Sequence, residues 1–114
     1  MIAVIFELWP KPEHRDAYFA LAAELRPLLE GIDGFISVER FASVSEPGKF
    51  VSLSFWRDAA AVAAWRNIAE HRLAQAQGRG QIFADYRLRV AEVSRDYGLT
   101  ERAEAPADSR ARHG

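Results

Sequence analysis

Hydrophobic and polar positions along this chain follow two different periods. Runs rich in β-branched and aromatic side chains either alternate at every second position or are apolar throughout, which predicts β-strands. Between these runs, apolar residues recur every three or four positions, which predicts helices with one buried stripe. The predicted elements are strands at 2–9, 35–41, 50–56 and about 81–95, and helices at about 13–29 and between an N-cap at Asp58 and a stop at Gly78.

The order strand, helix, strand, strand, helix, strand is that of the ferredoxin-like βαββαβ arrangement. We therefore expect an α+β fold in which an antiparallel four-stranded sheet carries two helices, forming one domain over residues 1–97. The segment 98–114 mixes Ala, Pro, Ser and charged residues and has few large apolar side chains. Such a segment buries too little surface to offset its ordering entropy. It is expected to be a flexible tail, or to become ordered only against another chain.

The predicted strands carry apolar side chains on both faces. The first strand has Glu7 as its one charged residue, and strict alternation along the last strand places Tyr86 on one face and Phe83 on the other. Two helices cover one face of such a sheet, so the other face would expose an apolar patch. A second copy packed sheet against sheet is the simplest cover, which predicts a homodimer. The alternative is that these residues are scattered and partly solvated.

Composition narrows the class of protein. A chain of 114 residues with 49% hydrophobic and 27% charged residues suits one globular domain, and a formal net charge of -1 gives no reason to expect a nucleic acid or a membrane as partner. The absence of cysteine excludes disulfides, thiol nucleophiles and thiolate metal sites. The N-terminal residues lack the features of a signal peptide, and no apolar run approaches membrane-spanning length. A cytoplasmic location is expected.

Polar residues on the second predicted helix lie close to its apolar stripe. On a helical wheel Arg72 falls inside the stripe that contains Trp65, and His71 lies at its edge with Asn67 one turn earlier. A helix that buries an indole and directs Arg, His and Asn towards the same boundary more often lines a cavity than a dry core. The sequence therefore predicts a cavity beside this helix.

His71 is the sharpest single candidate for chemistry. A neutral imidazole could ligate haem iron or act as a base on a phenol, because its unperturbed pKa lies near neutrality. The alternative is a boundary histidine bonded to a backbone carbonyl, to Glu70 or to Gln75. No second histidine or carboxylate stands at metal-ligand spacing on this helix, so a metal site made by protein ligands alone is not expected.

Arg72 requires a partner if it is buried, because an unpaired guanidinium in an apolar environment is costly. Glu7 on the first strand or Asp85 on the last could provide the carboxylate. Arg72 could form a structural ion pair with such a carboxylate, or it could bind an oxygen atom of a substrate, and the sequence favours neither. Arg79, between two glycines, could reach the mouth of a cavity or stay solvated.

Four segments give the chain a resemblance to a known family: MIAVIFELWP, EGIDGF, SFW and AAWRNIAEHRLAQAQGRGQIFADYRLRVAEV, which lie within residues 1–97. Over this range the chain resembles the antibiotic biosynthesis monooxygenase family of small dimeric α+β barrel proteins. The family includes monooxygenases that oxidise polycyclic aromatic phenols without metal or flavin, haem-degrading enzymes and proteins with no assigned activity. In the cofactor-independent oxygenases a pocket lies between helices and sheet, and the positions matching its Trp, Asn and polar ring residue are Trp65, Asn67 and His71.

Three functions follow from the residues and the resemblance together. In the first, a monooxygenase without metal or flavin oxidises a small aromatic phenol, with His71, Arg72 and Asn67 as catalytic residues. In the second, haem fills the pocket and His71 is the iron ligand, although Phe6 and Glu7 stand where the haem-degrading branch has an asparagine. In the third, the protein is a non-catalytic dimeric module that binds a ligand or stabilises a partner. The residues expected to bind the substrate are Trp65, Phe83, Tyr86, Glu7 and Arg79.

Overall fold

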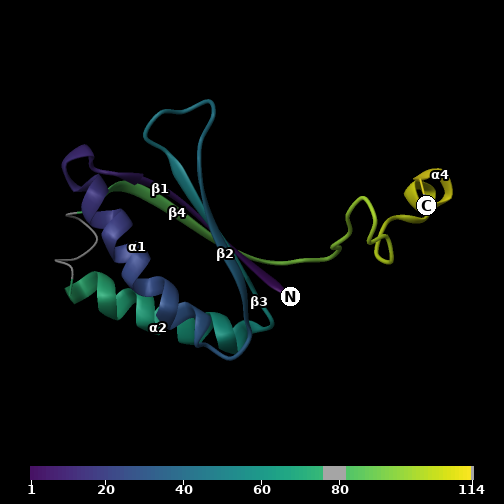
Figure 1. Cartoon of the computed structure of the whole chain (residues 1–114), viewed down its shortest axis with the longest axis horizontal. Coiled ribbons are helices and arrows are strands. Elements are labelled where there is room, and N and C mark those ends of the chain that lie inside the picture. The colour runs from purple at the N-terminus through teal and green to yellow at the C-terminus, as the bar shows by residue number, and fades with distance from the viewer. Residues whose placement is uncertain (76–81, 114) are drawn as a thin grey trace.

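The computed structural model describes residues 1–75 and 82–113. The strands and helices expected within the first 97 residues are all present, and the run of elements is shown in Figure 1. The elements are β1 (Ile2–Pro10), the 3-10 turn η1 (Pro12–His14), α1 (Arg15–Glu30), β2 (Phe35–Ala42), β3 (Phe50–Trp56), α2 (Ala59–Gln75), β4 (Phe83–Glu92) and α4 (Ala107–His113).

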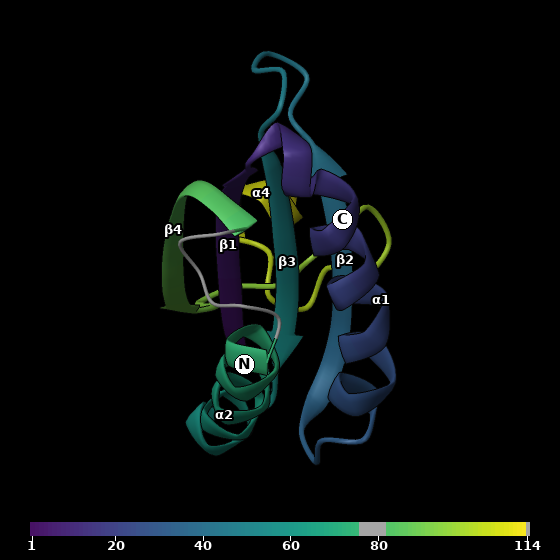
Figure 2. The same ribbon diagram turned by 90° about the vertical axis from the view of Figure 1, so that its left-hand side faces the viewer.

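In the described part of the chain the strands form one four-stranded sheet in the order β2-β3-β1-β4. Every pair of neighbouring strands is antiparallel. Both long helices lie on the same face of this sheet, with α1 and α2 side by side in front of the strands in Figure 2. The α+β ferredoxin-like fold predicted from the sequence is confirmed. Within the described residues, no helix is both long and apolar enough to cross a lipid bilayer.

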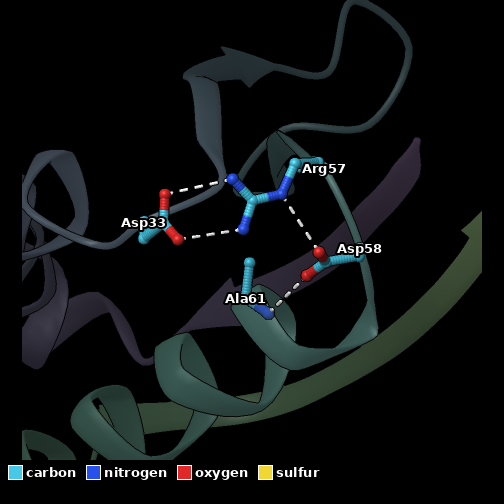
Figure 3. A network of polar contacts seen from close by, with 4 residues as sticks. All are labelled: Asp33, Arg57, Asp58 and Ala61. Atoms are coloured by element: carbon cyan, nitrogen blue, oxygen red, sulfur yellow. Dashed lines mark hydrogen bonds and ion pairs between the residues drawn. The ribbon is translucent and has the colours of Figure 1, made fainter.

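A polar network fixes the start of α2 against the turn that precedes β2 (Figure 3). The guanidinium of Arg57 donates two hydrogen bonds of 3.0 Å to Asp33 and one of 3.1 Å to Asp58. Asp58 accepts the backbone N–H of Ala61 at 3.0 Å, which makes it the expected N-cap of the helix. Gly34 adopts a φ of +95°, and a Cβ at this position would lie 2.8 Å from the Cβ of Ala61. Only glycine lets the turn and the helix approach this closely.

Two irregularities shift the alternation of side chains along the strands. The pairing register changes between Phe35 and Ser37 on β2, and between Trp9 and Pro10 where β1 pairs with β4. The second shift places Phe83 opposite Pro10, on the helix-covered face. The expectation from strict alternation, that Phe83 and Tyr86 point to opposite faces, is therefore wrong, since the two rings lie 5.7 Å apart. A bulge adds one residue and thereby turns the following side chains to the other face.

The core between helices and sheet is divided into two clusters of buried side chains. The first contains Leu8, Tyr18, Leu21, Ala22, Phe50, Ile82 and Phe83. The second contains Val4, Leu29, Val38, Trp56 and Ala61. Trp56 and Leu8 are fully buried, one in each cluster. Residues of both clusters line one cavity between the helices and the sheet.

The face of the sheet opposite the helices carries both apolar and charged side chains. Ile5 and Leu53 are paired across β1 and β3 at its centre and are half-buried, and Phe41 on β2 is 43% exposed. Glu7 on the same face forms ion pairs with Lys49 and Arg89. The centre of this face is thus apolar, as the sequence predicts, and charged groups stand beside it.

The C-terminal segment leads away from the sheet and folds on itself (Figure 1). Arg102 donates to the carbonyl of Gly98 at 3.1 Å and to the hydroxyl of Ser109 at 2.6 Å, while Ala105 is buried. The radius of gyration is 16.5 Å, against roughly 13 Å for a compact chain of this length. The segment therefore has local structure that the sequence analysis did not predict, and its flexibility stays a prediction.

Candidate active site

A partly open cavity of about 170 Å³ lies between the two long helices and the sheet. Its floor comes from the helix-facing side chains of the strands, and its walls come from α1 and α2. The lining residues are Val4, Phe6, Tyr18, Leu21, Ala22, Leu25, Leu29, Val38, Arg40, Ser52, Ser54, Trp65, Arg66, Ala69, Glu70, Leu73, Phe83, Tyr86 and Leu88.

The cavity draws its apolar lining from both core clusters. Val4 and Leu29 belong to one cluster, and Leu21 and Ala22 to the other. Apolar side chains on all sides favour an apolar ligand, and an apolar cavity of about 150 Å³ is large enough to hold a benzene molecule. The space suits one small, mainly apolar molecule.

Aromatic rings form one end of the cavity. The ring of Phe6 lies 5.6 Å from Phe83 and 5.7 Å from Tyr86, and the ring of Tyr18 lies 5.7 Å from Phe83. Trp65 lines the cavity from α2. The three aromatic residues expected from the sequence to bind the substrate, Trp65, Phe83 and Tyr86, thus lie around the same cavity.

A small polar group interrupts the apolar floor. Arg40 on β2 is half-buried, and its Nε donates to the hydroxyl of Tyr18 at 3.4 Å. Ser52 stands directly opposite Arg40 in the pairing of β2 with β3. Ser54 is buried, and its Oγ accepts the indole N–H of Trp56 at 2.9 Å. These side chains offer hydrogen-bond donors to a ligand in the cavity.

Arg66 and Glu70 line the cavity from α2, where both side chains are exposed. These two residues and Arg40 were not among the site residues predicted from the sequence. Arg66 follows Trp65 and Glu70 follows Ala69, and all four residues line the cavity. The face of α2 that meets the cavity is therefore rotated by about one residue relative to the apolar stripe on the helical wheel. The spacing of four between them was the signal available in the sequence.

The expected catalytic residues lie elsewhere. Asn67, His71 and Arg72 line a separate depression together with Leu28 and Ile68. The expectation that they share a cavity with Trp65 is wrong, because α2 turns these positions away from the sheet. The structure therefore brings the predicted aromatic walls together and leaves the predicted polar cluster outside.

Glu7 also lies apart from the cavity lining. Glu7 projects from the opposite face of the sheet, where Lys49 Nζ is 2.8 Å from its carboxylate and Arg89 binds its other oxygen. Hydrogen bonding to Lys49 first, and to Arg89 second, lowers the pKa of Glu7. Glu7 is thus not the partner of Arg72. Arg79 lies outside the described residues.

The haem alternative requires His71 to face the cavity. No group of three or more His, Cys, Asp or Glu among them could hold a metal ion. His71, the expected iron ligand, is exposed and does not line the cavity. Haem held in the cavity by His71 does not fit this arrangement.

The sequence matches known proteins over most of its length. The model of the family described as "Antibiotic biosynthesis monooxygenase" matches residues 1–77. The chain belongs to this family. The jasmonate monooxygenase ABM of Pyricularia oryzae is 49% identical over 94 residues, which cover 82% of this chain and 44% of that protein. The uncharacterized protein YqjZ of Bacillus subtilis is 35% identical over 94 residues, which cover 82% of this chain and 79% of that protein.

Solved structures share the fold of this antibiotic biosynthesis monooxygenase family member. Rv0793 from Mycobacterium tuberculosis superposes with a TM-score of 0.71 at 22% identity, covering 85% of this chain and 98% of the other. PA3566 from Pseudomonas aeruginosa gives a TM-score of 0.66 at 18% identity, covering 81% and 92%. The resemblance seen in the sequence is confirmed, and at these identities the structural likeness shows the fold alone.

Proposed function

We propose that this protein is a monooxygenase that inserts one atom of dioxygen into a small, largely apolar molecule bound between the helices and the sheet. The observation that supports this most is the apolar cavity of about 170 Å³ in a chain that is 49% identical to a jasmonate monooxygenase over 94 residues. A cavity of this kind holds a substrate by excluding water and by fixing its orientation.

The side chains of the cavity favour positioning over direct chemistry. Trp65, Phe83 and Tyr86 supply flat apolar surfaces against which a ring can pack. Glu70 is the one carboxylate of the lining among the described residues. We assign to it the role first given to His71, that of accepting a proton from a bound phenol, because His71 lies outside the cavity.

Two classes of substrate fit the cavity, and they differ in whether the reaction with dioxygen needs electrons from an external donor. An electron-rich phenol with a neighbouring CH₂ group can react with dioxygen alone: the CH₂ becomes a carbonyl, and its two hydrogens leave with the second oxygen atom as water. A jasmonate is not aromatic, so its hydroxylation consumes two further electrons from an external donor such as a reduced flavin. The aromatic walls favour the first class, and the likeness to jasmonate monooxygenase favours the second.

The test is oxygen uptake by the purified protein with anthrone or with jasmonate, each with and without reduced flavin. Uptake above the protein-free rate with either substrate supports the proposal, and dependence on the flavin identifies the class. Product formation is followed by mass spectrometry, since reduced flavin consumes dioxygen by itself. If neither substrate yields an oxygenated product, the non-catalytic ligand-binding module becomes the better account.

We also propose that two copies pack through the sheet face opposite the helices. Support comes from the apolar centre of this face, where Leu53 is paired with Ile5, and from the 43% exposure of Phe41. Sedimentation at micromolar concentration should show a dimer that Leu53→Glu dissociates. The control Val44→Glu changes an apolar residue that is already fully exposed. A stable wild-type monomer would contradict the proposal.

A further inference from the structure

One positive charge stands on the floor of a cavity that is otherwise mostly apolar. Arg40 projects from β2 beside Val38, and both residues line the cavity. Val38 is 6% exposed and Tyr18, which accepts from Arg40, is 5% exposed. Arg40 itself is half-buried, so its guanidinium is partly removed from water. A cation that is partly removed from water attracts an anion more strongly than an exposed cation does, so an anion that enters the cavity would be stabilised there.

The guanidinium of Arg40 has no carboxylate partner among the described residues. The one hydrogen bond of its side chain there runs from Nε to the hydroxyl of Tyr18 at 3.4 Å. Arg57 and Arg89, in contrast, are each ion-paired to a carboxylate. Two parallel hydrogen bonds to a carboxylate come from the Nη1 and Nη2 groups of an arginine, and within the described residues these groups of Arg40 have no hydrogen-bond partner.

Neighbouring groups add donors and leave the net charge positive. The hydroxyl of Tyr18 accepts from Arg40 and can donate its own proton to a ligand. The hydroxyl of Ser52, directly across the strand pair, is a further donor in the lining. The exposed charges of Arg66 and Glu70 on α2 are opposite in sign, so the lining carries a net charge of one from Arg40. A ligand with a single negative charge would therefore neutralise the lining of the cavity.

We propose that Arg40 anchors the carboxylate of a small apolar monocarboxylic acid, with the hydrocarbon part of the acid lying among the apolar and aromatic side chains. This inference rests on the proposed function of the cavity and specifies its substrate class. A carboxylate fits better than a phenol because it carries a full charge at neutral pH and matches the two-pronged geometry of the guanidinium. A phenol with a pKa near 10 stays neutral under the same conditions.

The experiment measures calorimetric affinities for three probes with eight carbon atoms each: octanoate, 1-octanol and 4-ethylphenol. The wild type should bind octanoate roughly ten- to a hundredfold more tightly than 1-octanol, as charge-assisted hydrogen bonds contribute. Arg40→Gln should remove this preference and leave the affinity for 1-octanol unchanged, which also shows that the variant is folded. Arg40→Lys should keep part of the preference, because it retains the charge and loses the fork.

The control is Arg87→Gln, which removes an exposed arginine of β4 on the opposite face of the sheet. It should bind all three probes as the wild type does. Equal affinities for octanoate and 1-octanol, unaffected by Arg40→Gln, would overturn the role of Arg40 while leaving the cavity as a binding site. Binding of 4-ethylphenol more tightly than octanoate would overturn it as well, and so would a loss of the preference for octanoate in Arg66→Gln but not in Arg40→Gln. If no probe binds, both the cavity site and the anchor fail.

Discussion

Replacing Ala22 by leucine tests how much space the cavity offers at this position and whether the cavity is the site of the reaction. Ala22 is 4% exposed, lies on α1 and lines the cavity. The substitution adds three carbon atoms at a position that faces the open space. If the space accepts them, burial contributes about 0.8 kcal/mol for each carbon, so the free energy of unfolding rises by up to about 2 kcal/mol.

If there is no space at this position, the substitution lowers the free energy of unfolding instead. Extra carbons forced into a close-packed core cost about 1–3 kcal/mol. The control is Ala23→Leu, one residue further along the same helix, where the side chain is exposed. Alanine and leucine have similar helix propensities, so this control should change stability by only a few tenths of a kcal/mol.

Urea unfolding followed by tryptophan fluorescence gives the free energies, and oxygen uptake with the active substrate gives the function. We expect Ala22→Leu to be at least as stable as the wild type and to have lost turnover. We expect Ala23→Leu to keep both the stability and the turnover of the wild type. A loss of stability above about 1 kcal/mol in Ala22→Leu would show that the position is already filled. Full turnover in a stable Ala22→Leu protein would place the reaction elsewhere.

Two further predictions concern the contact between the start of α2 and the turn that precedes β2. Gly34→Ala should lower the free energy of unfolding by roughly 2–4 kcal/mol in urea titration, because the positive φ and the short contact with Ala61 both oppose a Cβ. Arg57→Gln should destabilise the protein at neutral pH, and the difference from wild type should shrink as the pH falls below about 4. Arg57 is the main cause of the lowered pKa of Asp33, and for Asp58 it acts after the Ala61 N–H. The stability that carboxylates with a lowered pKa contribute is present above their unfolded pKa and is lost as they become protonated. A difference in stability between the wild type and Arg57→Gln that grew in acid would contradict this role of Arg57.

The order of elements could be predicted from the sequence because it depends on local periodicity. The alternation in 50–56 and the spacing of three and four around Trp65 each report on one element alone. Asp58 was recognisable as an N-cap for the same reason, since capping is a local interaction. Bulges are less visible, and the one near Trp9 reversed the expected orientation of Phe83.

The polar part of the site could not be predicted because it depends on how α2 is rotated against the sheet. Arg66 and Arg72 stand on different sides of the same apolar stripe, and the sequence alone did not tell which side meets the strands. Arg40 was hidden in the same way, since its strand alternates regularly and gives no sign that its inner face opens into a cavity. Packing of distant elements decides both positions.

The most direct test of the central claim is the incorporation of isotopically labelled dioxygen by the wild type, Ala22→Leu and Ala23→Leu under identical conditions. Mass spectrometry of the product should show one labelled oxygen atom with the wild type and with Ala23→Leu, and none with Ala22→Leu. Label in the product of all three proteins at the same rate would contradict the assignment of the cavity as the place of reaction.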